Sequence, residues 1–168
     1  MVNFVRSKVM LKGTDVVRPY FIFDLDGTLA LIDHRRPILN SNDEDKWDKF
    51  FMACDADVPN YPVIRVMQSL IDSGYGVKIF SGRGAIAQEK TIEWLVKYVG
   101  REYAERIDIR MRSEGEFTPG YNLKKQWFLA MNEEERKGCL GVFDDLNNDV
   151  MMWRDLGLVC FQVAEYKY

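Results

Sequence analysis

The chain has 168 residues, of which 47% are apolar and 13% aromatic, so it is long enough for one well-packed core and too short for two. Its formal net charge of −3 excludes a strongly basic protein that holds nucleic acid by bulk charge, and any polyanion must be bound locally. We therefore expect a single domain over residues 1–168.

The cysteines and the apolar runs exclude two further classes of protein. The three cysteines, Cys54, Cys139 and Cys160, are scattered and lack C-x-x-C spacing, which argues against a disulfide framework and against a zinc site. No apolar run approaches the roughly 18 residues of a membrane span. We expect a protein of a reducing cytoplasm, with no membrane association and no obligate protein partner.

Strand-like and helix-like stretches alternate along the chain. In chain order we expect a strand at Tyr20–Phe23, helices at 47–54 and 62–72, a strand at 77–80, a helix at 91–98, a strand at 107–111, a helix at 123–131, a strand at 139–143, a helix at 150–156 and a strand at 158–163. Ser41 or Asn42 would cap the first helix, and Gly74 and Gly100 would end the second and third. This alternation predicts an α/β fold, with a central parallel sheet and helices on both of its faces.

Residues 1–18 precede the first expected strand. The stretch V-R-S-K-V-M-L within them alternates weakly between apolar and polar side chains. We expect either an extra edge strand or a loosely held arm there.

Polar residues follow three of the expected strands, and ligands of such sheets bind at the carboxyl ends of strands. These residues are Asp24 and Asp26 after the first strand, Ser81, Gly82 and Arg83 after the second, and Asp144 and Asp145 after a later one. The three strand ends should therefore meet at one mouth that is acidic and suited to phosphate.

The chemistry of these residue types points to a magnesium-assisted reaction of a phosphate ester. Asp24 and Asp26 stand two apart and would face one pocket, and two anions in proximity need a cation between them or a proton on one of them. Clustered carboxylates suit Mg²⁺, which binds through one or two of them together with a substrate phosphate. Gly27 would let the backbone turn sharply. A carboxylate nucleophile paired with a second carboxyl as acid and base can transfer a phosphoryl group.

These residues come in the order of four motifs of the haloacid dehalogenase (HAD) superfamily phosphatases, which the chain resembles. The motifs are D-L-D-G-T at 24–28, S-G-R at 81–83, a helical lysine near Lys124 and D-D at 144–145. From about Tyr20 to the C-terminus the chain bears a closer resemblance to the 3′-phosphatase domain of bacteriophage polynucleotide kinase-phosphatase. The resemblance implies a Rossmann-like HAD fold and, if a phage encodes the chain, a location in the host cytoplasm.

The resemblance also implies a role for each matched residue. Asp24 would be the nucleophile, Asp26 the general acid and base, and Ser81, Arg83 and Lys124 would hold the phosphoryl oxygens. Mg²⁺ would bind Asp24, the backbone carbonyl of Asp26, Asp144 and Asp145. The substrate-binding residues would be Thr28, Arg35, Gly82 and Arg112, with Lys125 as the alternative to Lys124. The substrate would be a phosphorylated nucleic-acid end or a nucleotide.

The chain departs from this family in two places. Gly120 stands four residues before the motif lysine, where the family often has an aspartate. No phosphate loop of the form G-x-x-x-x-G-K-[ST] occurs in the 168 residues, so we expect no kinase activity from them. Between the first two motifs, residues of about 31–60 should form a small cap, which would leave the site open to a bulky substrate.

Several of these residues have a structural alternative. Arg35 and Arg112 can equally be partners in surface salt bridges, and His34 is expected to be a cap or loop residue. Asp149 is either an outer partner of the metal ligands or an acid suited to a helix start. Trp47, Phe50 and Phe51 form the core face of the cap helix or stack on a base, while Trp127 and Trp153 are expected in the core.

Three functions remain open from the sequence. The first is a Mg²⁺-dependent phosphatase that removes 3′-phosphates from polynucleotide ends, and the second is the same chemistry on free nucleoside monophosphates or another small phosphoester. The third is a non-catalytic module that binds phosphate or Mg²⁺. A second aspartate placed as a proton donor, Asp26, favours an enzyme over the third, and the cluster of Arg106, Arg110 and Arg112 gives modest support to a polynucleotide.

Overall fold

Within residues 18–164, which are the residues that the computed structural model describes, five strands form one sheet in the order β5-β4-β1-β6-β7. All four pairings between neighbours in this sheet are parallel. The strands are β1 (Tyr20–Phe23), β4 (Gly76–Gly84), β5 (Ile107–Arg112), β6 (Cys139–Asp144) and β7 (Cys160–Gln162). The expected parallel sheet is confirmed. The expectation for residues 1–18 concerns residues of which all but Arg18 lie outside the described part of the chain.

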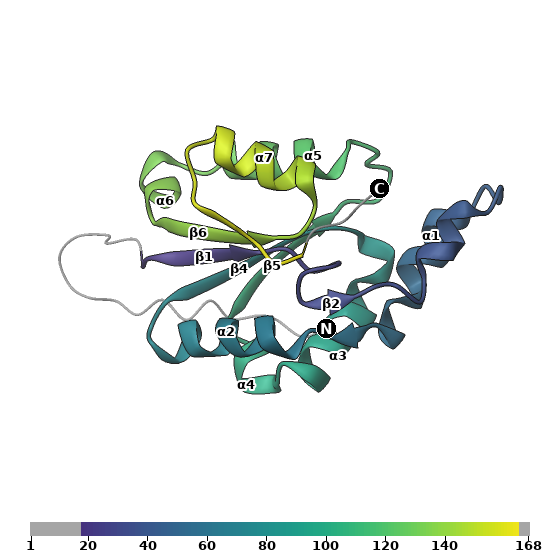
Figure 1. Cartoon of the computed structure of the whole chain (residues 1–168), viewed down its shortest axis with the longest axis horizontal. Coiled ribbons are helices and arrows are strands. Elements are labelled where there is room, and N and C mark those ends of the chain that lie inside the picture. Colours follow the sequence, from purple (N-terminus) through teal and green to yellow (C-terminus); the bar gives the residue numbers. More distant parts are fainter. Residues whose placement is uncertain (1–17, 165–168) are drawn as a thin grey trace.

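Helices cover both faces of the sheet (Figure 1). One face carries α2 (Tyr61–Asp72), α3 (Gln88–Tyr98) and α4 (Arg101–Ala104), and the other carries α5 (Gly120–Leu129), α6 (Glu133–Lys137) and α7 (Asn147–Asp155). Successive side chains of β1 point to opposite faces, so Phe23 packs in one core with Ile64 and Trp94, and Ile22 packs in the other. Trp127 and Trp153 lie in this second core, as expected.

The helix boundaries expected from the sequence differ from the observed ones mainly where polar residues begin a helix. Helix α5 starts three residues before the expected position and α7 also starts three residues before it. The first turns G-Y-N and N-N-D carry no apolar periodicity, so the pattern could not reveal them. Two short charged helices, α4 and α6, were not predicted for the same reason.

The segment between β1 and α2 holds the residues of the expected cap. It contains a small antiparallel pair, β2 (Ala30–Leu31) with β3 (Val58–Pro59), and helix α1 (Lys46–Met52) between 3-10 turns at Arg36–Asn40 and Ala53–Ala56. Helix α1 stands out from the rest of the molecule (Figure 1).

Two expectations for this segment are wrong. Neither Ser41 nor Asn42 caps α1, which begins at Lys46, because the hydroxyl of Ser41 accepts the backbone N–H of Asp43 in a local turn instead. Trp47 does not belong to the core: its side chain remains 52% exposed, whereas Phe50 is buried.

Two observations concern the membrane and the cysteines. None of the helices within residues 18–164 is long and apolar enough to cross a membrane. Cys54, Cys139 and Cys160 are all buried free thiols.

A tight turn after β1 depends on Gly27. The glycine has φ +94°, and its backbone N–H donates to the carbonyl of Ala30 at 2.7 Å. A Cβ at this position would overlap the carboxylate of Asp145, which is held by the hydroxyl of Thr28 at 3.0 Å. Glycine is therefore required both for the left-handed backbone and for the close approach of Asp145.

We expect Gly27→Ala to destabilise the protein more than Gly74→Ala does. Gly74 has φ +93°, and a Cβ added there would meet nothing within 4 Å, so its variant reports the backbone cost alone, about 1–2 kcal/mol. Gly27→Ala adds displacement of a buried carboxylate and loss of its hydrogen bond, about 1–3 kcal/mol more. Chemical denaturation of both variants measures the difference, and equal losses would contradict this account of the turn.

Candidate active site

The residues expected at the strand ends do come together at one edge of the sheet. Asp24 directly follows β1, Ser81 to Arg83 lie in the last part of β4, and Asp144 ends β6. Strand β1 lies between β4 and β6, and the backbone N–H of Asp24 donates to the carbonyl of Phe143 at 2.9 Å. The parallel register thus places the three segments side by side.

Three buried carboxylates form an acidic cluster at this edge. Asp24, Asp144 and Asp145 each offer an oxygen, and these oxygens lie within 4.8 Å of one another. Lys124 enters from α5, and its Nζ lies 2.8 Å from an oxygen of Asp24, of Asp144 and of Asp149. Asp149 thus contacts the same lysine as the proposed metal ligands.

The structure separates the two candidate lysines. Lys124 is buried in the acidic cluster, whereas the next residue, Lys125, is exposed on the outer side of α5. Lys124 therefore occupies the position expected of the motif lysine, and the structure does not bring Lys125 into the cluster.

The electrostatics of the cluster favour an additional cation. Burial raises the pKa of Asp24, and Asp144 and Asp145 add to this effect against the opposing charge of Lys124. Burial and then Asp144 raise the pKa of Asp145 to about 7. Burial alone would lower the pKa of Lys124, but Asp144, Asp24 and Asp149 outweigh it and raise that pKa. One ammonium group does not balance these carboxylates.

Asp145 carries the clearest sign of a cation site. Its Oδ1 accepts the hydroxyl of Thr28, but its Oδ2 is buried with no hydrogen-bond partner. Buried polar oxygens are normally satisfied. An orphaned carboxylate oxygen beside two further carboxylates fits a hard cation such as Mg²⁺.

Asp26 lies in a second charged network, separate from the lysine. Its Oδ1 accepts Arg35 at 2.8 Å and also accepts the guanidinium of Arg83, and both arginines bind the buried Asp57 as well. Burial raises the pKa of Asp26, but Arg83 and then Arg35 outweigh burial, so the pKa is lowered. The network therefore favours the ionised carboxylate.

Both arginines of this network are buried. Arg35 is fully buried, so the surface salt bridge considered for it is wrong. Arg83 is also buried, and donates to Thr91 at 2.9 Å besides the two aspartates. Both guanidiniums thus contact the carboxylate of Asp26.

Asp57 is the site residue that the sequence did not reveal. It accepts from Arg35 at 2.7 Å and from Arg83 at 2.8 Å, and His34 Nε2 lies 2.9 Å from it. His34 is thus a turn residue with a structural partner. An aspartate in the loop D-A-D-V-P belongs to no motif, and no signal in a single sequence marks it.

The remaining expected residues line the same edge in different ways. Ser81 is buried, and its Oγ accepts the backbone N–H of Arg83 at 3.2 Å, a bond that does not use its hydroxyl proton. Arg112 donates through Nε to the carbonyl of Gly82 at 2.8 Å. Gly120 opens α5 and contributes no side chain where the family often has an aspartate.

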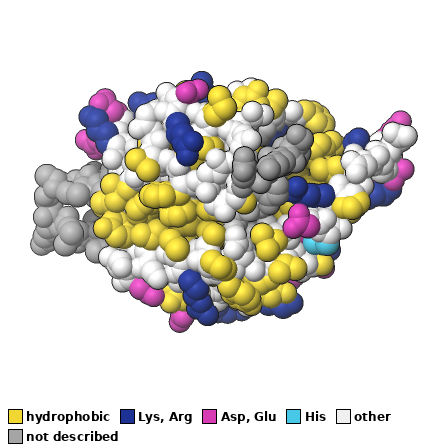
Figure 2. Space-filling model, viewed as in Figure 1, with side chains coloured by type: hydrophobic (Ala, Val, Ile, Leu, Met, Phe, Trp, Pro, Cys, Tyr) yellow, Lys and Arg dark blue, Asp and Glu magenta, His cyan; other side chains and the backbone are white. Residues whose placement is uncertain are grey.

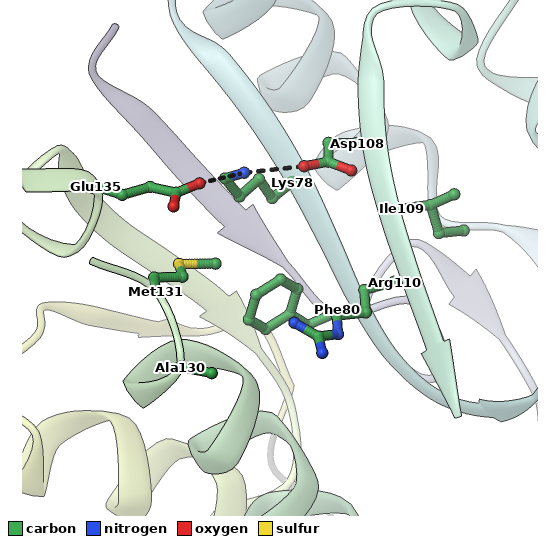
Figure 3. Close-up of a pocket in the computed structure, with 8 residues that line it drawn as sticks. All are labelled: Lys78, Phe80, Asp108, Ile109, Arg110, Ala130, Met131 and Glu135. Carbon is green, nitrogen blue, oxygen red and sulfur yellow. Dashed lines mark hydrogen bonds and ion pairs between the residues drawn. The ribbon is translucent and has the colours of Figure 1, made fainter. Parts of the chain in front are cut away.

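A surface hollow of about 320 Å³ lies elsewhere, along β4, β5 and the turn after α5 (Figure 3). Three of its charged side chains pair with one another, because Lys78 lies 2.9 Å from Asp108 and 3.3 Å from Glu135, and Arg110 lies over the ring of Trp127. None of the motif residues lines it. It therefore lies apart from the strand ends where the motif residues meet.

Known structures share the fold of this chain. A haloacid dehalogenase-like hydrolase from Streptococcus pneumoniae has the same fold, with a TM-score of 0.52 and 12% identity over 87% of this chain and 84% of its own. The class C acid phosphatase from Bacillus anthracis also shares it, with a TM-score of 0.53 and 20% identity over 82% and 55%. The fold is the Rossmann-like fold of HAD phosphatases.

A match to a family model is more specific than the shared fold. Residues 19–168 match the phosphatase domain of polynucleotide kinase PNKP, and the chain belongs to this family of HAD-type phosphatases. It is also similar to chains of the Pnkp1/Rnl/Hen1 complex, an RNA repair complex, with TM-scores of 0.71 and 0.72, 29% identity and coverage of 98% of this chain. It spans 48% and 52% of those two chains, about half of their length.

We expect Asp57→Asn to destabilise the protein by about 3–5 kcal/mol, because it leaves two buried guanidiniums short of a counter-charge. The matched variant Asp108→Asn breaks an ion pair whose carboxylate side chain is 72% exposed, and should cost less than about 1 kcal/mol. Urea denaturation of the two variants and the parent measures both values. Similar losses of stability at the two positions would show that the buried network contributes no more to stability than an exposed ion pair does.

Proposed function

We propose that the protein removes 3′-phosphates from polynucleotide ends, as a Mg²⁺-dependent phosphatase that forms an aspartyl-phosphate. One observation carries the proposal. Asp24 and Asp26 stand only two residues apart in the sequence, yet their side chains belong to different networks of charged residues. Asp24 lies with Lys124 in the acidic cluster, while Asp26 is held by Arg35 and Arg83. This separation supports Asp24 as the nucleophile and Asp26 as the acid and base.

In the first step, an oxygen of Asp24 attacks phosphorus and the bond from phosphorus to the sugar oxygen breaks. The departing oxygen takes a proton from Asp26, and an aspartyl-phosphate remains. Lys124 and the hydroxyl of Ser81 donate hydrogen bonds to the phosphoryl oxygens, which spread the charge in the transition state.

In the second step, Asp26 accepts a proton from water, which attacks phosphorus and breaks the bond to Asp24. The two guanidiniums favour the ionised form of Asp26 that this step needs. For the first step Asp26 must carry a proton. A bound phosphate dianion brings negative charge to the same edge and competes for the cations, which raises the pKa of Asp26 in the complex.

The acidic cluster would hold the metal in this proposal. Asp24, Asp144, Asp145 and the backbone carbonyl of Asp26 would be its protein ligands. When bound, Mg²⁺ supplies positive charge that lets an anionic phosphate approach an anionic nucleophile.

A second candidate is hydrolysis of free nucleoside monophosphates or another small phosphoester. It is favoured by the surface charge, since the net charge is −3 and the face in Figure 2 shows basic and acidic side chains scattered without a broad basic area. Membership in the PNKP phosphatase family supports the polynucleotide end instead.

We expect rapid Mg²⁺-dependent release of phosphate from a 3′-phosphorylated oligonucleotide, and much slower release from a 5′-phosphorylated one and from nucleoside monophosphates. Asp24→Asn should abolish release from all of them, because its amide is not a nucleophile. A malachite-green assay measures the phosphate. Preference for monophosphates would favour the second candidate, and activity that survives Asp24→Asn would refute the aspartyl-phosphate.

We expect Mg²⁺ to raise the melting temperature by roughly 5–10 °C at about 100 times its Kd, because it binds only the folded cluster. Asp145→Asn should lose this response, since it removes the charge of the orphaned oxygen. Asp43→Asn, which alters an exposed acid on the cap, should keep it. Differential scanning fluorimetry at constant ionic strength measures the shifts in melting temperature. An equal shift in the parent protein and both variants would refute Mg²⁺ binding at the acidic cluster.

A further inference from the structure

Phe117 presents a bare phenyl ring to solvent. It lies in the loop between β5 and α5 and is 90% exposed, while the next most exposed large apolar side chain within residues 18–164, Met151, is 62% exposed. Single exposed apolar residues are common on protein surfaces. This one stands out because of how its loop is built and where the loop lies.

The loop around Phe117 is held on both sides of the ring. One nitrogen of Arg112 donates to the carbonyl of Glu116 at 3.1 Å and to that of Thr118 at 2.7 Å. The carboxylate of Glu116 accepts the backbone N–H of Thr118 at 2.8 Å, which closes the turn. The backbone that carries Phe117 is thus fixed by its neighbours, and the ring itself takes no part in holding the turn.

The same arginine joins this turn to the phosphate-binding segment. Its Nε donates to the carbonyl of Gly82, the residue between Ser81 and Arg83. The loop follows the carboxyl end of β5, which is the edge of the sheet where Asp24 and the acidic cluster lie. One guanidinium therefore sets the distance between the expected phosphate site and the exposed ring.

The charge of the protein favours a contact with nucleic acid that is not electrostatic, and an aromatic ring can supply one. With a net charge of −3 and no broad basic area on the face in Figure 2, phosphate contacts alone supply little affinity for a nucleic-acid strand. Stacking of a base on an aromatic ring does not depend on bulk charge and accepts any base.

We propose that Phe117 is a nucleobase-stacking residue, which binds a base of the single-stranded end whose 3′-phosphate enters the site. The inference rests on the proposed polynucleotide substrate. It adds a binding site for the base beside the site for the phosphate, and it makes Arg112 the residue that positions the ring.

The test compares 3′-phosphorylated oligonucleotides that carry either normal bases or abasic sugars at their three terminal nucleotides. Binding is measured by fluorescence anisotropy with the Asp24→Asn protein, so that the result does not depend on turnover. We expect the normal oligonucleotide to bind about 5- to 150-fold more tightly than the abasic one. Adding Phe117→Ala should bring this ratio close to one.

Three further variants separate stacking from other effects. Phe117→Tyr keeps a flat ring and should keep the ratio, whereas Phe117→Leu keeps the apolar character without the ring and should lose it. Leu140→Ala truncates another exposed apolar side chain at the amino end of β6, at the opposite end of the sheet, and should also keep the ratio. A ratio that Phe117→Ala leaves unchanged, or that Phe117→Leu preserves, overturns the inference.

The outcome is distinguishable from failure of the proposed function. If the ratio depends on Phe117 but the parent protein releases no phosphate from these oligonucleotides, the 3′-phosphatase activity is refuted and base stacking stands. If the parent protein releases phosphate and the ratio does not depend on Phe117, the activity stands and base stacking is refuted.

Discussion

The contact of one buried ammonium group with three carboxylates is the constraint on which the site depends. Lys124 reaches Asp24, Asp144 and Asp149 at 2.8 Å each, and these carboxylates follow β1, end β6 and lie in the first turn of α7. The parallel pairing of β1 with β6 brings Asp24 beside Asp144, and such a pair would repel in a buried position without a cation. The helix that carries Lys124 must therefore pack where it does, with Trp127 one turn further along in the core beneath it.

The charges of the site fall into two groups with different tasks. The acidic cluster has more negative charge than Lys124 can balance, which suits it to receive a cation and a phosphate. The network of Asp26 with Arg35, Arg83 and Asp57 is balanced, with two cations and two anions. A balanced buried network holds its members in one geometry, which is what the proposed proton transfer by Asp26 would require.

The sequence predicted the parts of the site that follow from local pattern and missed those that depend on distant contacts. The apolar runs located the strands, and the polar residues after them located Asp24, Ser81 and Asp144 at one edge. Asp57 could not be found, because its importance arises from arginines 22 and 26 residues away in the chain. The exposure of Trp47 was also unpredictable, since helical spacing shows that three aromatic residues share a face but not what that face meets.

The balanced network also explains how the segment between β1 and α2 is attached. Arg35 and Asp57 belong to this segment, while Arg83 belongs to β4 of the sheet. Asp57 further accepts, through its backbone carbonyl, the indole N–H of Trp94 at 2.8 Å from α3. To swing away from the sheet, the segment would have to separate buried ions, at a cost of several kcal/mol for each charge left unpaired. The base of this segment is thus a fixed wall of the site. Helix α1 is tied to the same network, because Arg35 donates to the backbone carbonyl of Phe50 at 3.3 Å and its guanidinium lies 4.2 Å from the centre of that ring.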